Sequence, residues 1–484
     1  MNLFNKIKSK FQSQLLKRLR LFKLDMRRTQ DIDMQLVKLK SIKDPIKGLS
    51  FSEQLVNEYP NNPKAHLNFA FYLHKMGDIR QFDQMNKYAL ILRDWIGNNG
   101  TSEISEMEFI WSGMVTGSFG NHYAVEGLLR ANKYGLRIDK KPYLLLPKNS
   151  KLRNPALFSY FEPYINVIRD QEMIDALRGL EALLTIPLGI HLPINEKSPF
   201  LDIAANMCEV QRIKLGEDAA LFHLNQKHQN LGKEALKKLG LPVDAWYVTL
   251  HVREPGYRGE TLQNTDEDWR NANPLDYVNA CKAVTKAGGW VFRMGDPSMT
   301  IFPELPNVID YAHFEEIRSD WMDVFLGATC RFLISTASGY QRVPGYFGVP
   351  SIYTNCTSSV PYFSIFKNDL YLPRLLKYKN NNKYVSFEEL MSPPLSMLDS
   401  TKQFLEMGLE WIENTPEELE AATIEMLEKT DINISSKSDD SLQQRFKIMA
   451  ERCGPKYGGH SVKALASVSR EFLHRHVDLL EEEN

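Results

Sequence analysis

Short apolar runs alternate with helical patterns between residues 246 and 355, and this alternation constrains the fold more than any other feature of the chain. Two of the intervening segments, 274–286 and 321–328, carry apolar residues at helical spacing. Strands that alternate with helices predict a parallel sheet with helices on both faces. The runs that we expect to form its strands are rich in β-branched and aromatic residues and cover 246–250, 290–293, 307–310, 331–334 and 350–353.

Polar residues follow these predicted strands, where each strand ends. The first strand runs directly into a loop punctuated by glycine and proline, 251–260, which holds two arginines, a histidine and two glutamates. In open α/β sheets, ligands bind just outside the carboxyl ends of the strands. Arginine matches two phosphate oxygens, and a Ser/Thr/Gly loop adds hydroxyl and N–H donors, so these side chains predict a diphosphate site that works without a metal. Its candidate residues are His251, Arg253, Arg258, Arg293, Asp296, Ser335, Thr336, Ser338, Gly339 and Asn355.

Structural interpretations of the same residues stay open. The loop 251–260 could be an ordinary charged surface loop, and Arg293 could be the partner in a structural ion pair. Ser335 and Thr336 could cap a helix. Asp296 has a second functional interpretation, in which it binds ribose hydroxyls or the base. The anion site is favoured because so many of these residues meet at one edge of the sheet.

A second strand–loop–helix pattern precedes this region. The apolar run 109–111 is followed by the loop Gly117–His122, which leads into a helical pattern. Glycines permit a tight turn, and a helix N-terminus offers N–H groups to an anion or a sugar hydroxyl. The loop has neither the dinucleotide-binding spacing nor the P-loop spacing. Further strands are predicted at 143–146 and 165–168.

Composition excludes several function classes. The net charge of −1 argues against a nucleic-acid-binding surface over the whole chain. The five cysteines are widely spaced and lack the spacing of a metal site, which favours reduced thiols and a cytoplasmic location. No apolar run is long enough to span a membrane, and the first residues lack a signal-peptide core.

The N-terminal segment is strongly basic. Residues 1–28 carry nine lysines and arginines against one acidic residue, with apolar residues near helical spacing. The pattern fits a helix that lies on an anionic inner-membrane surface, although a solvated helix packed on its own protein is the favoured interpretation. A helical hairpin with the spacing of one tetratricopeptide-like unit follows at 62–92. One such unit cannot bury its own face and would have to pack on the next domain.

The motifs taken together resemble a known superfamily. The run His251-Val252-Arg253, the loop Gly117–Asn121 and the run Ile334–Gly339 resemble the fucosyltransferase superfamily, which has GT-B architecture. A bacterial glycosyltransferase family associated with surface-polysaccharide biosynthesis is a closer resemblance, which spans about residues 105–375 and is carried by the runs 251–256, 293–296, 319–326 and 338–355.

The resemblance implies an α/β, GT-B-like fold in which two Rossmann-like domains face a cleft, with a helical prefix and C-terminal helices. The break at Gly240-Leu241-Pro242 would separate the two domains. The expected parts are a basic amphipathic helix over 1–40, a tetratricopeptide-like hairpin over 41–104, an N-terminal acceptor-side domain over 105–240, a C-terminal nucleotide-sugar-binding domain over 241–400, and C-terminal helices over 401–484, the first of which opens with the capping box Thr415–Glu418.

The function implied by the resemblance is a glycosyltransferase that moves a sugar from a nucleotide-diphosphate donor to a hydroxyl of a glycan or lipid-linked acceptor. The enzyme would be of hexosyl or fucosyl type, inverting and metal-independent, with a GDP-linked donor as one option and no further cofactor. It would act in the synthesis of bacterial surface polysaccharide or glycoconjugates. The expected location is cytoplasmic, with residues 1–28 as an optional attachment to the inner face of the membrane.

Residue roles follow from the same resemblance. Arg253 would contact the donor diphosphate as the catalytic cation, and Ser335, Thr336 and Ser338 would bind phosphate. The residues that would border the cleft are Gly117, Gly120, Asn121 and His122.

One position departs from the family. Glu254 stands where core fucosyltransferases have a second arginine, which leaves fucose-specific chemistry open, and Arg258 is the candidate replacement. Transfer to a hydroxyl also benefits from a general base. Glu260 is the preferred candidate for that base, and Glu254 and His122 are the others.

Two other function classes remain open. Asp266 and Asp268 could serve a metal-dependent transferase or hydrolase, although a solvated acidic turn is the favoured explanation, because no predicted strand precedes them. A non-catalytic adaptor would account for the helical hairpin and the basic N-terminus. The adaptor leaves the polar edge of the predicted sheet unexplained.

Overall fold

The structure is a computed structural model, and its described residues form two compact units. It describes residues 30–42, 44–75, parts of 78–94, 107–110, 112–117, 123–136, 141–184, 201–255, 267–356, 366–431 except 393 and 399, 441–457 and 465–480. Unit 1 comprises Met1–Gly117, Ala131–Arg153 and Phe161–Phe200. Unit 2 comprises Ser118–Arg130, Asn154–Tyr160 and Leu201–Asn484, so residues 201–240 cluster with the second unit rather than with the first.

The first described elements of unit 1 are three helices. They are α3 (Gln30–Ser41), α4 (Pro45–Glu58) and α5 (Pro63–Lys75). Asp44 caps α4, because its carboxylate accepts the N–H groups of Ile46 and Lys47. Gly48 lets α4 approach α5, since a Cβ there would lie 2.1 Å from the ring of Tyr72. The helical prefix is therefore present, its likeness to a tetratricopeptide repeat stays a prediction, and the predicted helix over 1–28 lies outside the described residues.

A small parallel sheet follows in unit 1. Its strands β1 (Phe109–Ile110), β2 (Tyr143–Leu145) and β3 (Asn166–Ile168) lie in chain order. All three coincide with predicted strands. The helix α11 (Gln171–Leu184) packs on β1 and β2. Between these strands, α8 (Gly113–Thr116) and η2 (Glu162–Tyr164) belong to unit 1, whereas most of α9 (Tyr123–Lys133) and of α10 (Pro155–Phe161) clusters with unit 2.

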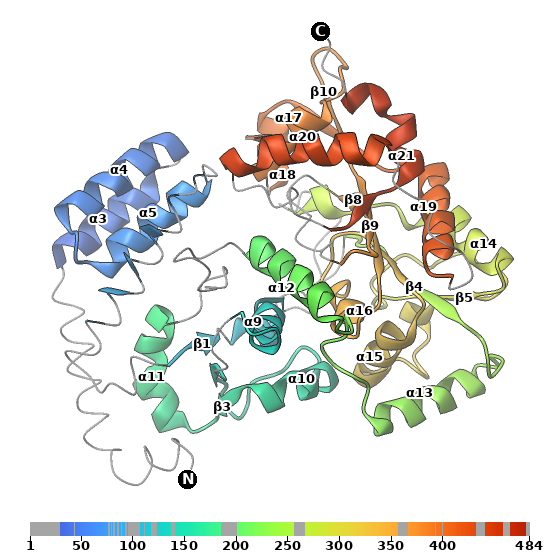
Figure 1. Cartoon of the computed structure of the whole chain (residues 1–484). Helices are drawn as coiled ribbons and strands as arrows, with labels where there is room; N and C mark the ends of the chain where they lie inside the picture. Colours follow the sequence, from blue (N-terminus) through green and yellow to red (C-terminus); the bar gives the residue numbers. More distant parts are fainter. Residues whose placement is uncertain are drawn as a thin grey trace. The chain divides into compact units, whose positions relative to one another are not determined.

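Unit 2 is organised around a seven-stranded parallel sheet (Figure 1). Its strands are β4 (Tyr247–His251), β5 (Trp290–Arg293), β6 (Val308–Ile309), β7 (Leu333–Ser335), β8 (Ser351–Cys356), β9 (Leu370–Pro373) and β12 (Ser467–Val468). The spatial order is β6-β5-β4-β7-β8-β9-β12. The chain thus starts at β4, moves outward to β6, returns to β7 beside β4, and moves outward again. This is the order of the doubly wound dinucleotide-binding fold, with β12 added at one edge.

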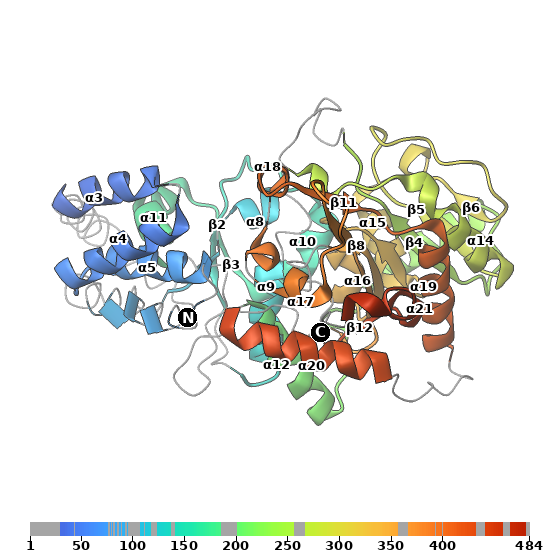
Figure 2. The ribbon, with the colours of Figure 1, turned by 90° about the horizontal axis from the view of Figure 1, so that it is seen from above.

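Helices pack on both faces of this sheet. The helix α14 (Val278–Lys286), which continues from η4 (Pro274–Tyr277), packs against α19 (Pro416–Lys429). On the other face, α15 (Asp320–Thr329) packs against α13 (Gln226–Lys238) and α16 (Arg342–Tyr346) (Figures 1 and 2). Gly232 allows close approach of α13, because a Cβ there would lie 2.2 Å from the ring of Phe325. The remaining helix before the sheet is α12 (Leu201–Leu215).

The part of the chain after β9 contains strands that were not predicted, and two of them, β11 (Leu409–Ile412) and β12, lie within the residues 401–484 for which only helices were expected. Antiparallel strands β10 (Leu375–Tyr378) and β11 form a separate pair, and β12 joins the main sheet. These strands have two to four residues, too few for an alternating pattern to stand out. The helical elements here are α17 (Phe387–Met391), η6 (Leu395–Met397), α18 (Thr401–Glu406), α19, α20 (Ser441–Tyr457), α21 (Arg470–Arg475) and η7 (Val477–Leu480).

The predicted capping box at the start of α19 is confirmed. Thr415 Oγ1 accepts the Glu418 N–H, and the Glu418 carboxylate accepts the Thr415 N–H at 2.8 Å. Among the described helices, none is both long enough and apolar enough to cross a membrane.

Candidate functional site

The strands β4 and β7 bring two predicted site segments together at the point where the strand order reverses. His251 at the end of β4 lies in register with Ser335 at the end of β7. The Thr336 N–H donates to the His251 carbonyl at 3.2 Å, and the Arg253 N–H donates to Thr336 Oγ1 at 2.8 Å. The predicted meeting of the His-Val-Arg run with the Ser/Thr segment is therefore confirmed. In doubly wound sheets, ligands bind in the crevice at this reversal.

His251 is a buried, neutral imidazole at this edge. Its Nδ1 is 2.9 Å from Ser338 Oγ, and its ring stacks on Tyr340 with 5.6 Å between centroids. Burial, together with the nearby positive charge of Arg293, lowers the pKa of His251 to about 4. Near neutral pH the neutral ring can therefore donate one hydrogen bond and accept another, but it does not bring positive charge to a ligand.

Arg253 points its guanidinium at the segment Glu267–Asn271, which we name the strap. Its Nη2 lies 2.7 Å from Glu267 Oε2, and its Nη1 donates to Asn271 Oδ1 and to the Glu267 carbonyl. The Arg253 side chain is 14% exposed and the Glu267 side chain 55%. The predicted catalytic cation is thus mostly buried at the sheet edge and is paired with a carboxylate that solvent reaches.

Two arginines that sequence reasoning missed hold the strap in place. Arg270 donates from Nε and Nη2 to the Ala337 carbonyl after β7, at 3.1 and 2.8 Å. Arg374, fully buried after β9, donates to the carbonyls of Trp269 and Asn271. The strap is therefore anchored to residues that follow β4, β7 and β9. The sequence gives little signal for either arginine, because one lies in a polar loop and the other follows a strand that was not predicted.

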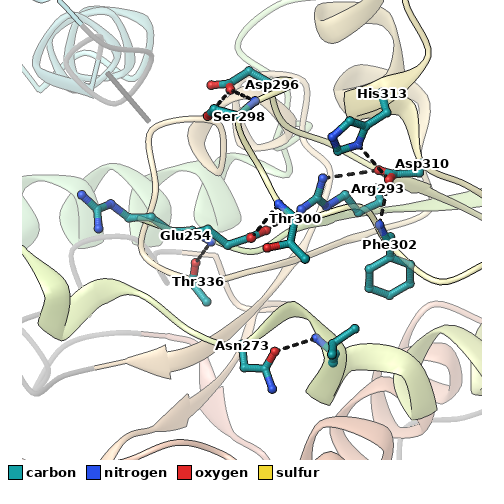
Figure 3. A network of polar contacts seen from close by, with 12 residues as sticks. Glu254, Asn273, Arg293, Asp296, Ser298, Thr300, Phe302, Asp310, His313 and Thr336 are labelled. Carbon is teal, nitrogen blue, oxygen red and sulfur yellow. Dashed lines mark hydrogen bonds and ion pairs between the residues drawn. The ribbon is translucent and has the colours of Figure 1, made fainter. Parts of the chain in front are cut away.

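Below the edge, Glu254 and Arg293 form a buried ion pair (Figure 3). Arg293 is 0% exposed and also lies 3.3 Å from Asp310. The second Glu254 oxygen accepts the Thr300 N–H at 2.9 Å. Asp310 in turn accepts the Phe302 N–H and contacts His313 Nδ1, both at 2.9 Å.

This geometry corrects two residue roles. Arg293 was a donor-binding candidate and Glu254 a candidate base, yet each side chain is buried and bonded to the other. The alternative interpretation, in which Arg293 is a structural ion-pair partner, agrees with the structure. Burial explains the pairing, since a guanidinium or a carboxylate in the interior needs an opposite charge.

Several other candidates use their polar groups within the fold. Asn355, with φ of 52°, exchanges hydrogen bonds with Asn414 and donates to the Tyr277 hydroxyl. Ser335 is fully buried, and its hydroxyl donates to the Thr336 carbonyl. The half-buried Asp296 accepts the N–H and the hydroxyl of Ser298 at 2.8 and 2.5 Å (Figure 3). Ser338 binds His251, and the partly exposed Gly339 follows it at the same edge.

The remaining candidates are placed as follows. Gly117 ends α8 in unit 1, where its N–H donates to the Gly113 carbonyl at 2.9 Å. Among the described residues, no group of three or more His, Cys, Asp or Glu side chains could hold a metal ion. The predicted residues that lie outside the described part of the chain are Gly120, Asn121, His122, Arg258, Glu260 and Asp266.

Comparisons with known proteins give no family. No protein-family model matches the chain, and no curated protein matches it. Among solved structures, it is similar to the ADP-heptose lipopolysaccharide heptosyltransferase II of Escherichia coli, with a TM-score of 0.30 and 10% identity over 51% of this chain and 84% of that one.

Two further similar structures are glycosyltransferases. A family 9 member from Veillonella parvula has a TM-score of 0.32 and 13% identity, over 51% of this chain and 80% of its own. The iron-containing dodecameric glycosyltransferase TibC of enterotoxigenic Escherichia coli has a TM-score of 0.28 and 12% identity, over 54% and 60%. None of the three bears the name of a fucosyltransferase, so that resemblance stays a prediction. At TM-scores of this size, the description of the fold rests on the strand order itself.

Proposed function

We propose that the protein is a glycosyltransferase that binds the diphosphate of a nucleotide-sugar donor at the carboxyl ends of β4 and β7. The observation that carries this proposal is the reversal of strand order between these two strands, with the Arg253 guanidinium beside it. A reversal point is where a doubly wound sheet binds a nucleotide. A guanidinium there supplies the charge and the paired donors that a diphosphate needs.

The chemistry asked of this site is stabilisation of a leaving group. The acceptor hydroxyl oxygen forms a bond to the anomeric carbon while the bond from that carbon to the diphosphate oxygen breaks. A base takes the hydroxyl proton, and the nucleoside diphosphate leaves with the electron pair of the broken bond. Negative charge therefore grows on the diphosphate, where Arg253 stabilises it without reorganising.

The neighbouring residues divide the remaining work. The neutral His251 offers a ring nitrogen for hydrogen bonding, while its Nδ1 lies beside Ser338. Ser335 and Thr336 hold the strand ends in register and thereby fix the backbone of Arg253. Glu254 is unsuited to act as the base, because one of its oxygens binds Arg293 and the other accepts the Thr300 N–H. We assign the base to Glu260, with a single displacement that inverts the anomeric centre.

The finer parts of the proposal concern the substrates. We propose a hexosyl- or fucosyl-type donor, with GDP as one nucleotide option, and a glycan or lipid-linked acceptor in bacterial surface polysaccharide synthesis. The basic segment 1–28 supports attachment to an anionic membrane surface, which would bring a lipid-linked acceptor within reach. Vesicle co-sedimentation, with and without residues 1–28, tests this last part.

Calorimetry with nucleoside diphosphates tests the central proposal. GDP, UDP and ADP would be titrated into the full chain in the presence of Mg²⁺ and again in EDTA. Binding that persists in EDTA and is lost in Arg253→Ala is the expected result. Strict metal dependence would favour a metal-dependent transferase or hydrolase instead, and no binding of any nucleotide would favour the adaptor.

A further inference from the structure

Two arginines of the sheet edge converge on one carboxylate oxygen. Glu267 Oε2 lies 2.7 Å from Arg253 Nη2 and 3.4 Å from Arg270 Nη1. The two arginines reach it from different directions, because Arg253 follows β4 and Arg270 lies within the strap. A single oxygen between two guanidinium groups has the surroundings that a phosphate oxygen seeks.

The arrangement is positioned by atoms other than Glu267. Arg270 also donates two hydrogen bonds to the Ala337 carbonyl, and Arg253 also donates to Asn271. The backbone of Asn271 is held from the interior by Arg374. Both guanidinium groups would therefore keep their places if the Glu267 carboxylate moved away.

Glu267 is the exposed partner of this cluster. Its side chain is 55% exposed, whereas those of Arg253 and Arg270 are 14% and 24% exposed. Rotation of the Glu267 side chain into water restores its hydration, and both guanidinium groups keep their other acceptors at Asn271 and Ala337, so the loss of an ion pair whose carboxylate is exposed costs little free energy. Most of the surface of both arginine side chains is therefore already shielded from water before a ligand arrives.

We propose that Arg253 and Arg270 together form the phosphate subsite and that the Glu267 carboxylate occupies it until a diphosphate displaces it. This inference rests on the proposed function for the identity of the ligand. Arg270 is thus a second donor-binding cation, in the role that the sequence alone offered to Arg258. Glu267 is an internal competitor, which sets the affinity for donor and product without touching either.

The test compares binding constants of Glu267→Gln and the wild type. Inorganic pyrophosphate, GDP and UDP are titrated into each full-length protein by calorimetry at low ionic strength. Because the competing ion pair is exposed, its removal should tighten binding by about threefold to fivefold. Glu315→Gln is the matched control, since Glu315 is an exposed glutamate of the same unit that takes no part in the strap, and it should bind like the wild type.

The variant Arg270→Met tests whether Arg270 contacts the ligand itself or only holds the Glu267 side chain in place. If Arg270 binds phosphate, Arg270→Met should weaken pyrophosphate binding by about tenfold or more, and by a similar factor in the Glu267→Gln background. If Arg270 only held Glu267, the substitution would have no effect once the carboxylate is gone. Arg270→Lys keeps the charge and loses the fork, and should bind with intermediate strength. The midpoint temperatures of thermal unfolding of all variants show whether loss of the Arg270 bonds to the Ala337 carbonyl destabilises the fold.

The outcomes distinguish this inference from the proposed function. Nucleotide binding that is equal or weaker in Glu267→Gln overturns the inference and leaves the proposed function standing. If Glu267→Gln binds pyrophosphate more tightly than the wild type, the inference stands. If nucleotides then bind no better than pyrophosphate, the proposal of a nucleotide-sugar donor is overturned. Failure of both probes to bind any variant overturns both.

Discussion

Replacement of Arg293 by methionine should destabilise unit 2 strongly. The Arg293 side chain is completely buried between Glu254 and Asp310, and Glu254 is only 5% exposed (Figure 3). Methionine fills much of the same volume but leaves the Glu254 carboxylate in the interior without a cation. Loss of one partner of a buried ion pair costs about 3–5 kcal/mol, against a total of roughly 5–15 kcal/mol for a domain. Asp310 loses less, because it keeps the Phe302 N–H and His313.

Urea denaturation of the wild type, the two single variants and the double variant measures this effect. Glu254→Gln keeps an acceptor for the Thr300 N–H and removes the charge, so the double variant Glu254→Gln/Arg293→Met should be more stable than Arg293→Met alone. The coupling free energy should reach about 1–3 kcal/mol. Arg475→Met is the control, because Arg475 forms an exposed ion pair with Glu471 one helical turn away, and its loss should cost less than about 0.5 kcal/mol.

Either of two results would refute the reasoning. If Arg293→Met unfolds like the wild type but no longer binds nucleoside diphosphates, Arg293 contacts the ligand and its burial against Glu254 does not represent the folded protein. Wild-type stability together with wild-type binding would show that the pair is energetically neutral, which would contradict the calculated cost.

Three further predictions follow from the site and the fold. Arg253→Ala should lower the transfer rate by about 10²- to 10³-fold in an assay of nucleoside diphosphate release, and it should lower the unfolding free energy by about 1–2 kcal/mol, because the mostly buried side chain also donates hydrogen bonds to the strap; near-normal turnover would contradict its role. The pKa of His251, about 4 in the fold against 6.5 without it, means that protons bind the unfolded chain first as the pH falls. The wild type should therefore lose about 2 kcal/mol more than His251→Gln between about pH 7.5 and pH 5, and equal losses would refute the neutral buried ring. Thr415→Ala removes the capping hydroxyl of α19 and should lower the unfolding free energy by about 1 kcal/mol, measured by thermal denaturation, whereas Ser298→Ala in an exposed turn should change it less.

The strands around the site could be predicted because each is a compact apolar run between breaks in the chain. The run 290–293 is β5 itself, and 246–250 differs from β4 by one residue at each end. Their register could also be anticipated in outline, since parallel strands share an edge. This is why the meeting of His251 with the Ser335–Ser338 segment was predictable.

Burial of individual charges could not be predicted in the same way. Arg293 closes a strand and looks like a residue at a ligand-binding edge, but its direction depends on Glu254, which lies on the neighbouring strand's loop. The partner of Arg253 is fourteen residues further along, after a stretch of sequence with no regular apolar pattern. Arg374 follows β9, whose Leu-Tyr-Leu-Pro sequence is too short to be separated from a loop. Contacts of this kind join residues that are far apart in the sequence, and the local pattern of a single sequence does not show which of them meet in the fold.

The position of β12 has a consequence for synthesis on the ribosome. The strands β4 to β9 can pair once residue 373 has been made, but β12, which covers the outer edge of β9, contains residues 467 and 468. At about 5–20 residues per second, translation of the intervening chain takes on the order of five to twenty seconds. During that time the outer edge of β9 has no partner strand, and unpaired strand edges can pair with strands of other chains. A nascent chain of this protein should therefore need a chaperone most while residues 374–466 are being translated.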